Sequence, residues 1–158
     1  MATKAKTAVE SFTNGCNCAQ AVFSTYAPHF GIAEQDAIRL STGFGAGIAR
    51  MQEVCGAVTG GVMVIGSAEG MNHPTEKERK EQTYTDVRDF VAKFKDKHRT
   101  ILCRELLGCD INTSEGKKYF DEQNLHSVKC TVFVRDAATL VEEYVLDKQK
   151  GRKGKNRG

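Results

Sequence analysis

Six cysteines are the residues of this chain best suited to chemistry, because a thiolate can act as a nucleophile, a redox group or a metal ligand. Zinc usually takes its ligands from close pairs such as Cys-x2-Cys, and the chain has neither such a pair nor a thioredoxin-like Cys-x-x-Cys. Scattered cysteines leave four interpretations open: an iron–sulfur cluster, thiol redox chemistry, zinc binding, and buried structural thiols. The cysteines are Cys16, Cys18, Cys55, Cys103, Cys109 and Cys130.

Two of the cysteines lie at the start of predicted helices. Asn17 is followed three residues later by Gln20, which is the pattern of a capping box and places Cys18 in the first turn of a helix over about 18–27. Cys55 opens a run over 54–68 that carries no charge and four glycines. Because each glycine costs a helix about 1 kcal/mol relative to alanine, we expect a buried central helix whose backbone approaches a neighbour closely.

Two further cysteines have a similar setting. Cys103 lies in the first turn of a short helix that Gly108 closes, and Cys130 lies near the start of the last helix, expected over 127–148. Helix N-termini favour anions, and a thiolate or a cluster of thiolates with bridging sulfides is an anion that accepts N–H···S bonds. The sequence therefore predicts that four helix starts converge on one site.

Helical periodicity accounts for the rest of the chain, with helices expected over 3–13, 33–40, 75–97 and 114–122 and a capping box at Thr75–Glu78. The predicted fold is all-α: a single compact multi-helix domain, 1–147, with a buried glycine-rich central helix, followed by a disordered basic C-terminal tail, 148–158. The glycine-rich loop Gly43–Gly47 lacks a following Gly-Lys-Ser/Thr, so nucleotide binding is not favoured.

The charge and the apolar segments of the chain indicate which partners it can bind and where in the cell it is located. The formal net charge is +3, but the tail holds six of the 23 basic residues, so 17 basic residues face 20 acidic ones in the remainder. A short basic tail without apolar side chains favours a solvated end over nucleic-acid binding. No segment reaches the length needed for a membrane span, and residues 1–6 lack the apolar core of a secretory signal. We therefore expect a cytoplasmic protein.

The chain resembles a family of redox-active proteins named for its dispersed C, GCAxxG, C, C cysteine pattern. The resemblance covers about residues 5–147, and the order at the second motif is here Cys-Gly-Ala-x-x-Gly. It implies redox activity and suggests that the four shared cysteines bind an iron–sulfur cluster. Some relatives are fused to haem-binding segments, but this chain has no Cys-x-x-Cys-His. The matching segments are Asn17–Val22, Cys55–Gly60, Cys103–Gly108 and Cys130.

These observations lead to one expectation and two alternatives. We expect electron transfer by an iron–sulfur cluster held by Cys18, Cys55, Cys103 and Cys130, of the [4Fe–4S] type, with the nuclearity left open. The alternatives are a thiol–disulfide redox protein that uses the same cysteines, and a zinc-binding structural or sensor module.

Other questions stay open at this point. Cys16 and Cys109 lie outside the four-cysteine pattern and could be auxiliary ligands, resolving thiols or incidental residues. The four histidines are assigned no role at the site. No acid–base pair can be located, so no catalysed reaction is assigned, and the redox partner is not identified. The glycine-lined helix leaves homo-oligomerisation open.

Overall fold

The structure is a computed structural model that describes residues 3–155; of residues 3, 148–149 and 151–155 only the backbone is described. It confirms the all-α fold: the described residues form helices and turns, with one isolated β-bridge between Val54 and Leu102. The helices are α1 (Thr3–Thr13), α2 (Cys18–Tyr26), α3 (Glu34–Ser41), α4 (Gly56–Glu69), α5 (Lys77–His98), α6 (Cys103–Leu107), α7 (Ser114–Glu122) and α8 (Thr131–Lys155).

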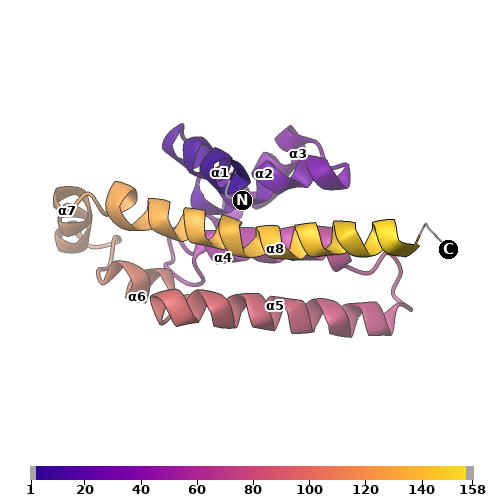
Figure 1. Ribbon diagram of the computed structural model, residues 1–158. Helices are drawn as coiled ribbons and strands as arrows, with labels where there is room; N and C mark the ends of the chain where they lie inside the picture. Colours follow the sequence, from indigo (N-terminus) through magenta and orange to yellow (C-terminus); the bar gives the residue numbers. More distant parts are fainter. Residues whose placement is uncertain (1–2, 156–158) are drawn as a thin grey trace.

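Helix α4 is the centre of the molecule, as its uncharged sequence predicts. It packs against α2, α5 and α8, and Figure 1 shows α4, α5 and α8 running alongside one another, with α1 to α3 on one side and α6 and α7 at one end. The side chains of Val58, Val64 and Ile65 are buried together with Phe90 of α5 and Val141 of α8. Removing these groups from water on three sides stabilises a helix that its glycines would otherwise disfavour.

Glycine allows α2 to approach α4 closely. A Cβ atom on Gly60 would lie 2.8 Å from the carbonyl oxygen of Ala19 and 3.0 Å from the Cβ atom of Val22, both on α2. The predicted capping box at the start of α2 is present, since the Asn17 side chain accepts from the Gln20 N–H and the Gln20 side chain accepts from the Asn17 N–H. The start of α2 is thus fixed locally, and its position on α4 is fixed by Gly60.

Substitutions at two glycines of α4 test this packing. We expect Gly60→Ala to lower the free energy of unfolding by about 1–2 kcal/mol, because the clash with the Ala19 carbonyl exceeds the gain of about 1 kcal/mol in helix propensity. Gly66→Ala is the matched control, since a Cβ atom there meets nothing within 4 Å; it should stabilise the protein by up to about 1 kcal/mol. Urea denaturation of both variants measures the difference, and equal effects would rule out the close approach of α2.

The start of α5 differs from the prediction. The sequence predicts a capping box at Thr75–Glu78, but the helix begins at Lys77 and its N-cap residue, Glu76, makes no side-chain cap bond. The Glu76 carboxylate instead accepts hydrogen bonds from the N–H groups of Asn72 and His73, while the Thr75 hydroxyl bonds the His73 ring. Local bonds within the preceding turn compete successfully with the cap.

The last helical segment begins within one residue of the predicted start but extends beyond its predicted end. Residues His126–Cys130 form one π-helical turn that continues directly into α8. At the other end, α8 continues to Lys155, beyond residue 148, where the sequence predicts disorder. Extending an existing helix needs no new nucleation step, and the good helix propensity of lysine and arginine offsets part of the cost of Gly151 and Gly154. The last part of the predicted tail, residues 156–158, lies outside the described residues.

Candidate functional site

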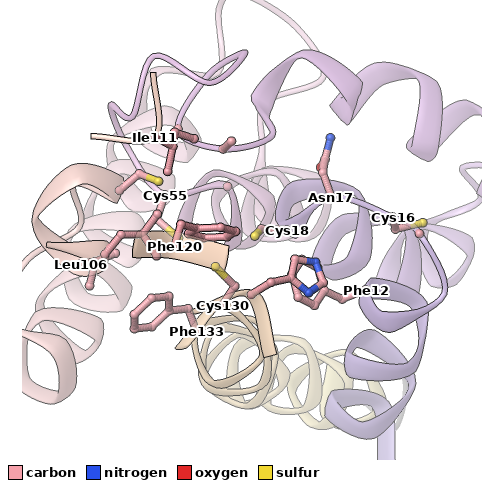
Figure 2. Close-up of a pocket in the computed structure, with 17 residues that line it drawn as sticks. Phe12, Cys16, Asn17, Cys18, Cys55, Leu106, Ile111, Phe120, Cys130 and Phe133 are labelled. Carbon is pink, nitrogen blue, oxygen red and sulfur yellow. The ribbon is translucent and has the colours of Figure 1, made fainter. Parts of the chain in front are cut away.

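The four cysteines of the sequence pattern line one cavity at the end of the bundle where α2, α4, α6 and α8 begin. The cavity has a volume of about 260 Å³, several times the roughly 30 Å³ share of one liquid water molecule. Most of its other lining is apolar and aromatic, including Phe12, Phe120 and Phe133 (Figure 2). The cysteine side chains that line it are those of Cys18, Cys55, Cys103, Cys130 and also Cys16.

Gly56 brings the first two cysteines together. Cys18 is the first residue of α2 and Cys55 is the N-cap residue of α4. A Cβ atom on Gly56 would lie 3.1 Å from the Cβ of Cys18 and 3.0 Å from the Ala19 nitrogen. The Cys-Gly-Ala-x-x-Gly motif therefore has a physical explanation: its cysteine faces the cavity, and its two glycines, one helical turn apart, let α2 lie against α4 beside that cysteine.

A short antiparallel contact joins the second and third cysteines. The Cys55 N–H donates to the Ile101 carbonyl and the Cys103 N–H donates to the Glu53 carbonyl, each with an N···O distance of 2.7 Å. Residues Val54 and Leu102 form the β-bridge between these two bonds. The starts of α4 and α6 are thus tied together although 48 positions of sequence separate their cysteines.

The loop before Cys55 has an uncommon backbone. It contains five non-glycine residues with positive φ, at angles between 48° and 65°. The left-handed conformation costs an L-residue about 1–2 kcal/mol, so the surrounding contacts must offset several such costs. Gly47, also left-handed, lies against the site, since a Cβ atom there would be 2.8 Å from the Cβ of Cys103. The five residues are Ala46, Ile48, Ala49, Arg50 and Gln52.

Cys130 lies next to a helix start, as predicted. We expected it near the start of the last helix, and it is the last residue of the π-helical turn that leads directly into α8. The helical segment begins earlier, where the N–H groups of Ser127 and Val128 bond the carbonyl of Asn124, a residue with φ of 50°. The site therefore has three cysteines at helix N-termini and a fourth on a π-turn, a feature that is frequent at functional sites.

Burial keeps most of these thiols protonated when no cation is bound. Burial raises the pKa of Cys55 from 9.0 to about 12, partly opposed by hydrogen bonds from the N–H groups of Ala57 and Val58 at the start of α4. Burial likewise raises the pKa of Cys103 to about 11. Neighbouring cysteines contribute to both increases, because each thiolate disfavours the next.

Cys18 and Cys130 form a hydrogen-bonded pair, and Figure 2 shows their sulfur atoms next to each other. The bond raises the pKa of Cys18, the donor, well above its ordinary value, and burial raises it further. The same bond lowers the pKa of Cys130, the acceptor, and the charge of Lys129 adds to that effect. In this pair the Cys18 thiol keeps its proton, whereas the Cys130 thiol loses its proton more readily.

Four cysteine thiols around one apolar cavity are a donor set that could hold an iron–sulfur cluster. A cluster binds its thiolates through different iron atoms, and soft thiolates are the ligands that such iron prefers. Four mutually repelling thiolates in an apolar cavity also require cations to offset their charge, which iron would supply.

The two remaining cysteines lie in different places. Cys16 lines the cavity, but Figure 2 shows its sulfur apart from those of Cys18 and Cys130. Cys109 does not line this cavity and lies in the loop that follows α6, beside a separate surface pocket.

Sequence reasoning missed several residues around the cavity. Neither the aromatic lining nor His126, which lines the cavity and stacks on Phe12 with ring centroids 4.3 Å apart, was given a role from the sequence. The buried Gln52 was not singled out at all. Only its position three residues before Cys55 could have drawn attention to Gln52, and that signal is weak.

The fold and the site define an all-α protein with a cavity lined by cysteine thiols. Comparison of the sequence with family models identifies its family. Residues 16–144 match the family described as "Putative redox-active protein (C_GCAxxG_C_C)". Because the match covers most of the chain, the protein belongs to this family of redox-active proteins. The comparisons with curated proteins and with solved structures gave no match.

Proposed function

We propose that the protein carries one electron at a time on an iron–sulfur cluster held by Cys18, Cys55, Cys103 and Cys130. The observation that carries the proposal is the convergence of these four thiols, distant in sequence, on one apolar cavity. When bound, the cluster supplies the redox chemistry. The family's description as redox-active agrees with this assignment.

Groups of the protein around the cluster would determine how easily the cluster is reduced. Burial disfavours the added negative charge of the reduced state, while N–H groups directed at sulfur favour it. The N–H groups of Ala57 and Val58 approach the Cys55 sulfur, and the start of α2 lies at Cys18. In the part of the chain that the structure describes, no helix is long and apolar enough to cross a membrane. We expect the partner to be another redox protein.

Stepwise reduction without oxygen tests the electron-transfer proposal. Purified protein would be titrated with dithionite and followed by low-temperature electron paramagnetic resonance. We expect a signal that grows with uptake of one electron per cluster and disappears on reoxidation. A protein that takes up no electrons, or that takes up two with the formation of free thiols, would contradict one-electron transfer by a cluster.

One observation favours a second function, thiol–disulfide exchange. The hydrogen bond between Cys18 and Cys130 places two thiols of different acidity side by side. The Cys130 thiolate would attack a small disulfide and release one thiolate, and Cys18 would then attack the mixed disulfide and release the second. The products are a Cys18–Cys130 disulfide and two small thiols, so that two electrons are transferred.

Oxidised glutathione tests this exchange in the metal-free protein. We expect a disulfide between Cys18 and Cys130, detected by mass spectrometry after the remaining thiols are alkylated, and two equivalents of reduced glutathione. Cys130→Ser should prevent that disulfide. Random pairing, or a preferred pair such as Cys103 with Cys109, would contradict the assignment of this pair.

A further inference from the structure

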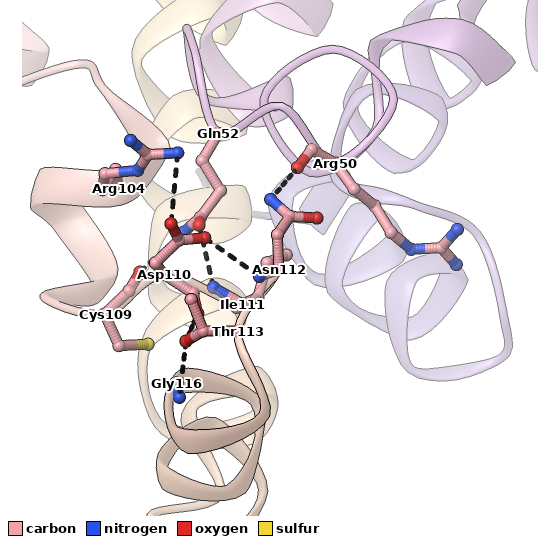
Figure 3. Close-up of polar contacts among 9 residues, drawn as sticks. All are labelled: Arg50, Gln52, Arg104, Cys109, Asp110, Ile111, Asn112, Thr113 and Gly116. Carbon is pink, nitrogen blue, oxygen red and sulfur yellow. Dashed lines mark hydrogen bonds and ion pairs between the residues drawn. The ribbon is translucent and has the colours of Figure 1, made fainter.

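Gln52 is the most buried polar side chain near the cysteines, with 3% of its surface exposed. It comes from the left-handed loop before α4, and its amide reaches across to the loop that follows α6 (Figure 3). Its Nε2 donates to the Cys109 carbonyl and its Oε1 accepts from the Ile111 N–H, each at 2.9 Å. A single side chain thereby joins two loops that are more than fifty positions apart in sequence.

One N–H of this amide remains after those two bonds. A glutamine amide has two N–H donors, of which the Cys109 carbonyl takes one. Gln52 lies beside Cys103, since a Cβ atom on Gly47 would be 2.7 Å from the Gln52 Cα and 2.8 Å from the Cys103 Cβ. A hydrogen bond from Gln52 also acts to lower the pKa of the Cys103 thiol, against the larger effect of burial. The backbone holds the two residues together as well, since the Arg104 N–H donates to the Gln52 carbonyl.

The left-handed loop directs this amide inward. Gln52 has a φ of 56°, and its N–H donates to the Ala46 carbonyl within the loop. An extended conformation at this position would point the side chain elsewhere, because the direction of the Cβ atom follows the backbone. The uncommon backbone is therefore used to bury an amide beside a thiol.

We propose that Gln52 is a positioning residue for the redox site, which donates an N–H···S hydrogen bond to Cys103 and thereby favours the reduced state of the cluster. This inference rests on the proposed function, since a reduction potential is defined only for the loaded site. It goes beyond that function by assigning control of the potential to a residue outside the cysteine pattern. Hydrogen bonds to ligating sulfur stabilise added negative charge and raise reduction potentials.

The test compares Gln52→Met with Asn112→Ala in the loaded protein. Methionine has a similar length but no donor, so we expect reduction to become about two- to tenfold less favourable, which for one electron lowers the potential by about 18–59 mV. Asn112 is the matched control, because its Nδ2 donates to the Arg50 carbonyl and so joins the same two loops without donating to Cys103. We expect Asn112→Ala to leave the potential unchanged.

Three outcomes decide the proposal. A lower potential in Gln52→Met alone supports it, whereas equal changes in both variants indicate a structural role only and overturn it, as does an unchanged potential in Gln52→Met. If that variant does not fold, Gln52→Glu replaces it, because a carboxylate keeps the acceptor for the Ile111 N–H and lacks the donors. The potential should then fall further, owing to the added negative charge.

A second readout separates this proposal from the proposed function. If the wild-type protein binds no iron and sulfide, the proposed function fails, and the hydrogen bond is tested in the metal-free protein. Alkylation of Cys103 by iodoacetamide at fixed pH should then be about two- to tenfold slower in Gln52→Met than in the wild type. The rate at Cys55 should stay unchanged, because its N–H donors come from α4. Equal or faster alkylation of Cys103 would overturn the proposal.

Discussion

Cys55→Ser should abolish cluster binding while leaving the fold intact. Serine is a good N-cap residue, so its hydroxyl can accept a hydrogen bond from the first N–H groups of α4, such as those of Ala57 and Val58, which lie near the Cys55 sulfur. It lacks the soft thiolate that iron prefers in these clusters. We therefore expect iron and acid-labile sulfide to fall to background, with an unchanged far-ultraviolet circular dichroism spectrum.

Cys109→Ser is the matched control for this substitution. Cys109 does not line the cavity, so its removal should leave iron and sulfide at wild-type levels. Full retention of iron and sulfide by Cys55→Ser would contradict the ligand assignment. A parallel variant, Cys16→Ser, decides whether the fifth cysteine at the cavity is an auxiliary ligand; its separated sulfur leads us to expect normal loading.

The metal-free protein should lose stability steeply in alkaline solution. Burial raises the pKa of Cys55 from 9.0 to about 12, so the folded state holds this proton more tightly than the unfolded chain does. Its contribution is fully present below pH 9 and is lost as the pH rises towards 12. At 1.36 kcal/mol for each pH unit, the loss from Cys55 alone approaches about 4 kcal/mol, a large fraction of the stability of an ordinary domain.

Urea denaturation across this pH range checks the prediction. Lysines and tyrosines also titrate there, so the informative quantity is the difference between the wild type and Cys55→Ser, each without metal. We expect the free energy of unfolding to fall more steeply with pH in the wild type. Parallel curves would mean that the Cys55 thiol ionises as readily in the folded state as in the unfolded one.

The fold could be predicted largely from sequence because helical periodicity is a local signal. The Asn17–Gln20 capping box and the uncharged run that forms α4 each gave an element whose position the structure confirms. Cys55 could also be placed at the start of a buried helix, because a glycine-rich helix is stable only when it packs closely against a neighbour. Only the structure shows that Gly56 and Gly60 fit against α2.

The parts that could not be predicted depend on contacts between distant residues. The left-handed conformation of Ile48 and Arg50 contradicts their intrinsic preferences and is held by bonds across the loop and to α6. The burial of Gln52 follows from its bonds to residues 109 and 111, which no local pattern reports. The left-handed Asn124 and the π-helical turn that follows it could not be predicted, because neither has a clear sequence signature.

Metal and sulfide analysis of protein purified without oxygen tests the central claim most directly. The account predicts near-equal amounts of iron and acid-labile sulfide, together with broad visible absorption that dithionite bleaches. The iron content per chain would also fix the nuclearity of the cluster. One zinc ion per chain without sulfide would contradict the cluster assignment, and so would a colourless, metal-free protein that stays colourless after incubation with iron and sulfide.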